Sequence, residues 1–188
     1  MKKLILMAAV MLASVGAYAQ HAVGSFTLQP KVGVSIANLT DSKADSRVGF
    51  VGGVEGEYQV TDIFSISGAA LYSMQGVKKD NVTTKLDYIN VPIMANVYVV
   101  KGLAVKLGIQ PGFKVNASAK ADIVAVDFDK AVKTVDFSIP VGVSYEYQNF
   151  VLDARYNLGL TNVEKKEYFD TKSKNSVFQI TLGYKFDL

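Results

Sequence analysis

The sequence predicts an all-β protein, an eight-stranded antiparallel up-and-down transmembrane β-barrel. The segment 177–186 alternates without a break, with Phe178, Ile180 and Leu182 among the apolar residues on one face. A period of two is that of a β-strand. The same alternation recurs in seven earlier segments, behind a secretory signal. An exported chain built from alternating strands is typical of an outer-membrane barrel.

The first 19 residues predict a signal peptide, and residues 20–188 predict the barrel domain. Lys2 and Lys3 form a basic start, residues 4–15 are apolar, and Ala17-Tyr18-Ala19 has the small–x–small form of a cleavage site. The apolar run is too short to span a bilayer and fits export better than a core helix. We therefore expect cleavage after Ala19. The chain has no cysteine, which excludes a lipidated cysteine anchor and disulfides.

The remaining chain divides into strands joined by turns of alternating length. The predicted strands are 26–38, 47–60, 63–75, 86–99, 103–116, 135–147, 150–161 and 177–186. Short turns lie at 61–62, 100–102 and 148–149, whereas longer polar connections lie at 40–46, 76–85, 117–134 and 162–174. In outer-membrane barrels the short turns are periplasmic and the long loops extracellular, which puts both termini in the periplasm. Residues 123–128 predict an extension of the third long hairpin.

The less apolar strand face, rich in glycine and serine, predicts the lumen. Glycine in a strand indicates tight space, which a narrow barrel has inside and a solvent-exposed face does not. A soluble barrel would reverse the two faces. We expect Gly108, on the luminal face, to accept one extra methyl group, and Leu107 to face lipid. Aromatic residues near the short turns predict an interfacial girdle: Tyr58, Phe64, Tyr145, Tyr147, Phe150, Tyr184 and Phe186.

The luminal face also collects charges that balance in sign. They are Lys31, Lys106, Lys114, Arg155 and Lys185 against Glu55, Glu57, Asp136, Glu146 and Asp153. Eight strands leave an interior that side chains fill, and paired charges can be held there. The set predicts a salt-bridged plug, with a gated ion path or proton-binding cluster as the alternative. Individual pairs depend on the strand stagger, which the sequence does not show.

Residues suited to catalysis are sparse. His21 is the single histidine and precedes the first strand, so a histidine-dependent lipase or protease lacks its base. No Cys/His cluster offers a metal site and no glycine-rich loop offers a phosphate site. The formal charge of +3 falls to +1 without Lys2 and Lys3, which argues against nucleic acid as a partner. We expect no enzyme activity, no cofactor and no metal.

Several segments together resemble a known family. They are residues 31–35, 71–76, 86–93, 107–112 and 182–186, and Tyr88-Ile89-Asn90-Val91-Pro92 and the closing strand are the most specific. They resemble the Bacteroidetes-type outer membrane protein beta-barrel domain family, also labelled porin family or PorT-like. The resemblance implies an eight-stranded barrel inserted by the barrel-assembly machinery. The chain departs from the usual aromatic terminus, since it ends Phe186-Asp187-Leu188.

Three functions fit these observations. The first is a structural or surface-binding barrel in outer-membrane lipid, whose extracellular loops contact a partner of unknown identity, because loops on a rigid scaffold carry such functions. The second is a narrow porin for ions or small solutes. The third, which the PorT-like label implies, is an accessory barrel of a secretion system.

Overall fold

The computed structural model describes residues 21–40, 45–79, 82–121, 124–127, 133–162 and 174–188. The predicted signal peptide and its cleavage site at Ala19 lie outside these described residues. Among the described residues, no helix is long and apolar enough to cross a bilayer.

The described chain is built from strands alone. Their bounds are β1 (Phe26–Leu39), β2 (Asp45–Thr61), β3 (Phe64–Lys79), β4 (Val82–Asn90), β5 (Ile93–Val100), β6 (Leu103–Ala121), β7 (Val124–Asp127), β8 (Val135–Tyr147), β9 (Phe150–Asn162), β10 (Lys174–Tyr184) and β11 (Phe186–Asp187). Every pairing between them is antiparallel.

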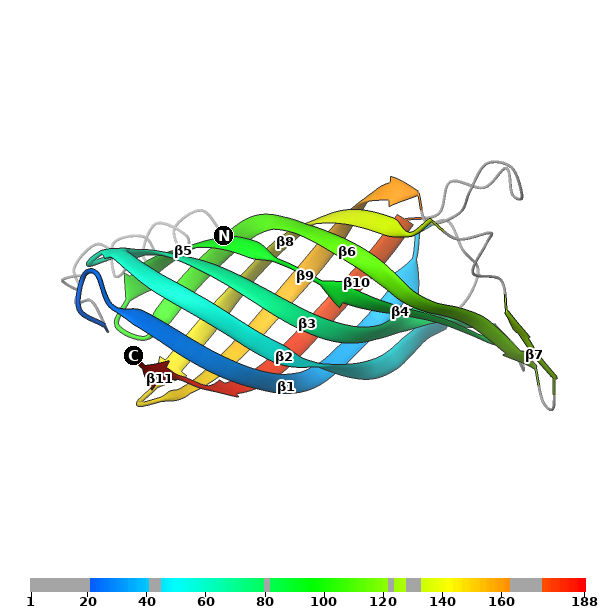
Figure 1. Ribbon diagram of the computed structural model, residues 1–188, viewed down its shortest axis with the longest axis horizontal. Helices are drawn as coiled ribbons and strands as arrows, with labels where there is room; N and C mark the ends of the chain where they lie inside the picture. Colours follow the sequence, from blue (N-terminus) through cyan, green and yellow to red (C-terminus); the bar gives the residue numbers. More distant parts are fainter. Residues whose placement is uncertain (1–20, 41–44, 80–81, 122–123, 128–132, 163–173) are drawn as a thin grey trace, which may run out of the picture.

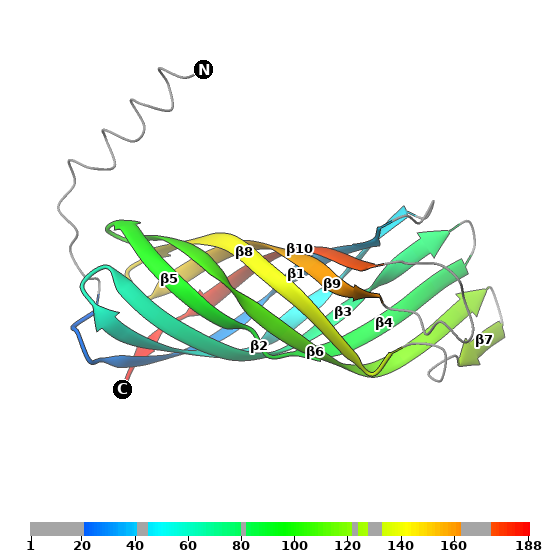
Figure 2. The same cartoon turned by 90° about the horizontal axis from the view of Figure 1, so that it is seen from above.

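The strands close into a barrel, which confirms the predicted fold class. The strands pair around the barrel in the order β1, β2, β3, β4, β6, β8, β9 and β10, and β10 returns to pair with β1 from Lys31–Gly183 to Leu39–Asn175. β4 and β5 share one position between β3 and β6, and β11 continues β10 along β1, so eight strands complete the circuit. Figures 1 and 2 show the short turns and the C-terminus at one end of the barrel and β7 at the other. Closure leaves no unpaired sheet edge in the membrane.

The predicted strand 86–99 is wrong as one continuous element, because β4 ends at Asn90 and β5 starts at Ile93. Pro92 lies in the gap and has no backbone N–H to donate to a neighbour. Backbone hydrogen bonds nevertheless link the two residues of this gap to the neighbouring strands β6 and β3. Val91 N donates to Pro111 O at 2.9 Å, and Ala69 N donates to Pro92 O at 3.0 Å.

In two of the predicted long loops, at least half of the residues are strand. β3 continues to Lys79 and β4 begins at Val82, so the predicted loop 76–85 is mostly a paired hairpin. β6 continues to Ala121 and pairs with β7. This pairing confirms the predicted hairpin extension for the described part of residues 123–128. Both hairpins carry backbone hydrogen bonding past the barrel at the loop end (Figure 1).

The two strand faces differ as predicted. Leu107 on the outer face is 55% exposed, whereas its neighbour Lys106 on the inner face is 3% exposed. The apolar face is therefore outside, and the soluble-barrel alternative with reversed faces is excluded. The predicted girdle residues lie near the short turns, where Tyr184 contacts both Phe150 and Phe186 with ring centroids 5.2 and 4.8 Å apart.

The inner face is more crowded than the sequence analysis expected. A methyl group on Gly108 would lie 2.1 Å from Ile93 O and 2.9 Å from Met94 Cα. Since these are backbone atoms, they cannot turn away, and the expectation that Gly108 accepts a methyl group is wrong. Gly68, on the outer face, has open space around the same position.

Candidate functional site

The charged side chains of the inner face meet in two groups. The first, called the central cluster here, consists of Lys31 on β1, Glu55 on β2, Lys106 on β6, and Asp153 and Arg155 on β9. All five are buried. Period-two alternation points each side chain inward, because each lies an even number of residues from other inward-facing positions of its strand.

Glu55 accepts contacts from all three cations of the central cluster. Lys31 Nζ lies 2.8 Å from its Oε2, Lys106 Nζ lies 2.9 Å from its Oε1, and Arg155 Nη2 lies 3.5 Å from its Oε2. β2 and β6 are three positions apart around the barrel, and so are β2 and β9. The pairs of Glu55 with Lys106 and Arg155 therefore cross the lumen, whereas its pair with Lys31 links the adjacent strands β1 and β2.

Asp153 binds the same three cations from the other side. Its Oδ2 lies 2.9 Å from Lys106 Nζ and 3.7 Å from Lys31 Nζ, and its Oδ1 accepts from Arg155 Nε at 2.9 Å. Shared partners make the cluster one network, in which removal of a single carboxylate affects every cation.

The second group lies nearer the short turns and is called the lower cluster here. Lys185, between β10 and β11, binds Glu146 of β8 at 2.8 Å and Glu57 of β2 at 3.1 Å. Glu57 also accepts from Ser65 Oγ at 2.5 Å and from the Tyr98 hydroxyl. The lower cluster joins both ends of the chain to the barrel wall, because it also includes His21.

His21 is the member that sequence reasoning missed. Its Nε2 lies 2.9 Å from Glu146 Oε1, and its Nδ1 lies 2.9 Å from Asp187 Oδ1. The hydrogen bond to Glu146, with the negative charges of Glu146 and Asp187, raises the pKa of His21 above 6.5; partial burial and Lys185 oppose this. Strand alternation could not have found this contact, because His21 precedes β1 and has no parity.

The remaining two predicted luminal charges belong to neither cluster. Lys114 lies eight residues beyond Lys106 on β6 and is half-buried. Asp136 on β8 accepts from Asn175 Nδ2 at 3.0 Å and from the Thr161 hydroxyl. Both residues lie further toward the loop end. The structure therefore divides the ten predicted charges into five central, three lower and two outer ones.

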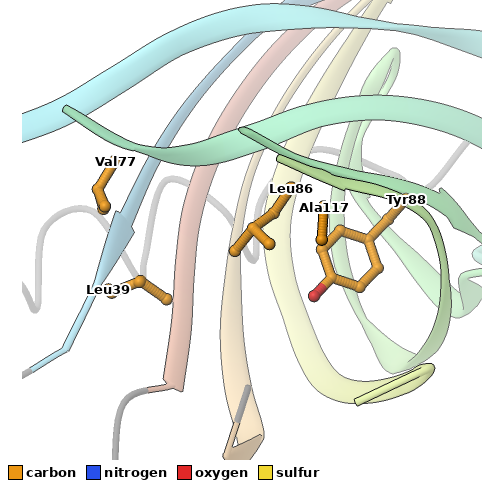
Figure 3. Packing of buried hydrophobic residues seen from close by; sticks show 5 residues of the cluster. All are labelled: Leu39, Val77, Leu86, Tyr88 and Ala117. Carbon is orange, nitrogen blue, oxygen red and sulfur yellow. The ribbon is translucent and has the colours of Figure 1, made fainter. Parts of the chain in front are cut away.

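The loop half of the lumen contains an apolar cluster, which sequence reasoning did not predict. Five buried residues form a cluster there: Leu39, Val77, Leu86, Tyr88 and Ala117. Figure 3 shows them directed toward a common space between the ends of β1, β3, β4 and β6. The signal for this cluster was available, because Leu86 and Tyr88 are large apolar residues on the parity opposite to Ile89. The loop half of the lumen thus combines this apolar cluster with a few charged groups, among them Asp136 and the Arg47–Asp87 pair at 3.7 Å.

The described residues offer little for metal or redox chemistry. No group of three His, Cys, Asp or Glu side chains among them has the geometry to hold a metal ion. The carboxylates of both clusters are held by lysine, arginine or histidine. Such an arrangement fixes side chains across the lumen.

Comparison with solved structures shows the same fold in small outer-membrane proteins. Ail, the attachment invasion locus protein of Yersinia pestis, matches with a TM-score of 0.56 at 16% identity, covering 88% of this chain and 100% of Ail. Neisserial surface protein A (NspA) matches with a TM-score of 0.58 at 18% identity, covering 86% and 97%. A third match, TM-score 0.52 at 17% identity over 88% and 100%, is Ail in complex with the heparin analogue sucrose octasulfate.

A search of curated proteins found no match to this sequence. The family model described as "Outer membrane protein beta-barrel domain" matches residues 18–165. That range covers most of the chain and agrees with the closed eight-stranded barrel and its apolar outer face. The chain therefore belongs to the outer membrane protein beta-barrel domain family and is a bacterial outer-membrane protein.

Proposed function

We propose that this protein is a plugged, non-enzymatic barrel that acts through its loop end. The observation that carries the proposal is the central cluster, whose ion pairs cross the lumen between Glu55 and the cations Lys106 and Arg155. An eight-stranded barrel has an interior of side-chain width. A network spanning that width leaves no continuous path for a solute, so the outer surface and the loops remain for function.

The loop end has the features of a presenting surface. The β3–β4 and β6–β7 hairpins extend past the barrel (Figure 1). The apolar cluster beneath them supports their base from inside the lumen. In the orientation that the short turns favour, these hairpins are extracellular and both termini are periplasmic. A rigid scaffold carrying long hairpins is suited to binding a partner outside the cell.

Two further points support this proposal over catalysis and transport. Both ring nitrogens of His21 lie within 2.9 Å of carboxylates, which leaves neither free to act as a general base. The same fold binds a ligand in one relative, since Ail forms a complex with sucrose octasulfate. Outer-membrane lipid around the barrel and the barrel-assembly machinery during insertion are the partners that this role requires.

The finer family resemblance is part of the same proposal. Tyr88 to Pro92, its most specific segment, forms the junction between β4 and β5, and Tyr88 anchors the apolar cluster. A Bacteroidetes-type, PorT-like barrel would be exported by residues 1–19, cleaved after Ala19, and able to serve as an accessory of a secretion system. Recovery of defined secretion-system subunits with the intact barrel from outer membranes would support that role, and recovery of none would remove it.

Single-channel recording in planar bilayers tests the plug directly. The unmodified protein should give no steady conductance. The double variant Glu146→Gln with Asp153→Asn removes one carboxylate from each cluster. The three central cations then share Glu55 alone, and the surplus positive charge should open a small anion-favouring leak. A large, stable conductance from the unmodified protein would contradict the proposal and make a narrow porin the better account.

Binding through the loop end needs a separate test. Replacing residues 118–127 with a two-residue turn removes the β6–β7 extension and the partners of residues 82–85 on β4, and it leaves the pairing of β6 with β5 and β8 in place. We expect cells carrying the intact protein to adhere to sulfated glycan surfaces and cells carrying the shortened protein to lose this adhesion. Heat-modifiable migration on a gel controls for folding. Equal adhesion by both proteins would exclude this hairpin as the binding element.

A further inference from the structure

The central cluster is not electrically balanced. Three cations, Lys31, Lys106 and Arg155, share the two carboxylates Glu55 and Asp153, which leaves a net charge of +1. Every ion pair of these cations within 4.0 Å among the described residues ends on one of the same two carboxylates. Unbalanced charge in a buried site is costly unless a counterion accompanies it.

The lower cluster supplies negative charge only from a distance: Glu57 acts electrostatically on Lys106, but among the described residues the two form no ion pair within 4.0 Å. Its carboxylates Glu57 and Glu146 are bound by Lys185 at 3.1 and 2.8 Å, and Glu146 also by His21 at 2.9 Å. The balance of five positive and five negative luminal charges in the sequence therefore conceals an uneven distribution in space. The surplus of positive charge lies in the middle of the barrel.

Arg155, one of the three central cations, has a donor group that no acceptor uses among the described residues. Its Nε and Nη2 are used by Asp153 at 2.9 Å and Glu55 at 3.5 Å. Its Nη1 is buried and has no hydrogen-bond partner among the described residues, and the side chain is 1% exposed. A buried guanidinium N–H without an acceptor indicates a site where an acceptor belongs.

The neighbours of Arg155 have unused polar atoms as well. Gln179 on β10 lies directly opposite Arg155 in the register, and its Oε1 has no partner. Asn157, the next inward residue on β9, has neither amide atom bonded, and Thr181 Oγ1 on β10 is also unpartnered. The Gln179 NH₂ group donates to Ser73 Oγ at 3.2 Å; reversal of the amide would present this group in place of the oxygen and let the oxygen accept from the Ser73 hydroxyl. Together these residues can offer several neutral donors beside one cationic donor.

We propose that Arg155, Gln179 and Asn157 form a binding site for a small inorganic anion of halide size inside the lumen. The anion accepts from Arg155 Nη1 and from the amide and hydroxyl donors around it, and it neutralises the central cluster. This inference concerns the inside of the barrel and does not depend on the proposed role of the loops. The competing occupant is water, which would satisfy the same atoms without supplying charge.

Bromide titration of the folded protein tests the site. The purified barrel is heated in detergent at constant ionic strength while sodium bromide replaces sodium gluconate, whose anion is too large for the lumen. Unfolding is followed by loss of the fast-migrating band. A bound anion stabilises the folded state by mass action, so the midpoint temperature should rise with bromide and reach a plateau. A midpoint that is the same in both salts would overturn the proposal and leave water as the occupant.

A matched pair of variants locates the effect. Gln179→Glu places a carboxylate of the same shape opposite Arg155 and should raise the midpoint in gluconate while removing the response to bromide. Gln110→Glu adds the same charge beside Ser138, four residues from the partner of Arg155 on β8, and should leave the bromide response intact. A bromide response that survives in Gln179→Glu would place the anion elsewhere and overturn the assignment.

Diffraction from crystals of the unmodified protein grown in bromide provides a check that does not depend on the variants. The account predicts an anomalous scattering peak within hydrogen-bonding distance of Arg155 Nη1. Ordered water in that position with no anomalous signal would contradict the proposal.

Discussion

The middle of the barrel and its short-turn end both enclose charged side chains behind a wall that faces lipid, but the residues of the two walls differ. In the middle, the inner wall holds five charges whose ion pairs within the described residues are all with one another, and the outer wall is aliphatic around Leu107. At the short-turn end, the inner wall holds a cluster that includes His21, and the outer wall is aromatic around Phe150 and Tyr184. The two regions differ in how closely each borders water.

That difference determines what each region tolerates. Charges in the middle have no access to solvent, so each depends on its partners. At the end, Lys185 and Glu146 are themselves buried, but their network reaches through His21 to Asp187, which is exposed to water. On the outer wall, the cost of a charge likewise falls from the membrane centre toward its interface. We therefore expect substitutions in the middle of the barrel to destabilise it more than substitutions at the short-turn end, on both the inner and the outer wall.

The largest effect is expected from Asp153→Asn. The change leaves Lys31, Lys106 and Arg155 with Glu55 alone, and stranding buried charge costs about 3–5 kcal/mol. Urea unfolding in lipid vesicles, followed by the mobility shift on a gel, measures the loss. Asp136→Asn, outside both clusters, serves as the control and should cost less. Equal losses from the two changes would show that the central cluster is not a distinct network.

On the outer wall, Leu107→Arg should destabilise by about 2–4 kcal/mol because it puts a cation in the hydrocarbon core. Tyr147→Arg, close to the short turn and 65% exposed, should cost about 0–1 kcal/mol because it lies at the interface. Gly68→Ala, with open space around it, controls for changes on this face. The comparison fails if arginine is tolerated equally at both positions.

Within the lower cluster, Glu146→Gln should have a smaller effect than Asp153→Asn. Lys185 still pairs with Glu57, and His21 still pairs with Asp187. The change therefore removes only the charged hydrogen bonds to Glu146, which lowers the free energy of unfolding by about 1.5 kcal/mol. The same urea experiment measures it. A loss as large as that of Asp153→Asn would mean that the lower cluster is as isolated from water as the central one.

The smallest effect is the pH dependence that His21 brings. A pKa raised in the folded state gives a stabilisation that is complete below the unfolded pKa of 6.5 and is lost as pH rises through the folded pKa. Midpoints of the unmodified protein should therefore fall slightly over that range. His21→Gln should flatten this part of the profile, and an unchanged profile would show that His21 does not bind through its charge.

Sequence reasoning recovered the parts of this structure that depend on local periodicity. Alternation found the strands, their faces and the inward direction of residues such as Glu55 and Arg155. It could not find which charges meet, because the pairing of Glu55 with Lys106 depends on the stagger of β2 against β6, which local sequence does not encode. His21 escaped because it lies outside any strand. Pro92 carried a signal for the β4–β5 break that the alternation around it concealed.

Tryptophan quenching by brominated lipids tests the central claim, that one strand face meets lipid while the other encloses a sealed interior. The chain has no tryptophan, so single substitutions report without background. Leu107→Trp should be quenched most by bromine deep in the acyl chains and Tyr147→Trp by bromine near the headgroups. Tyr98→Trp, at a buried luminal position, should escape quenching in a barrel that still shows heat-modifiable migration. Quenching of Trp at position 98 as strong as at 107 would contradict the assignment of the two faces.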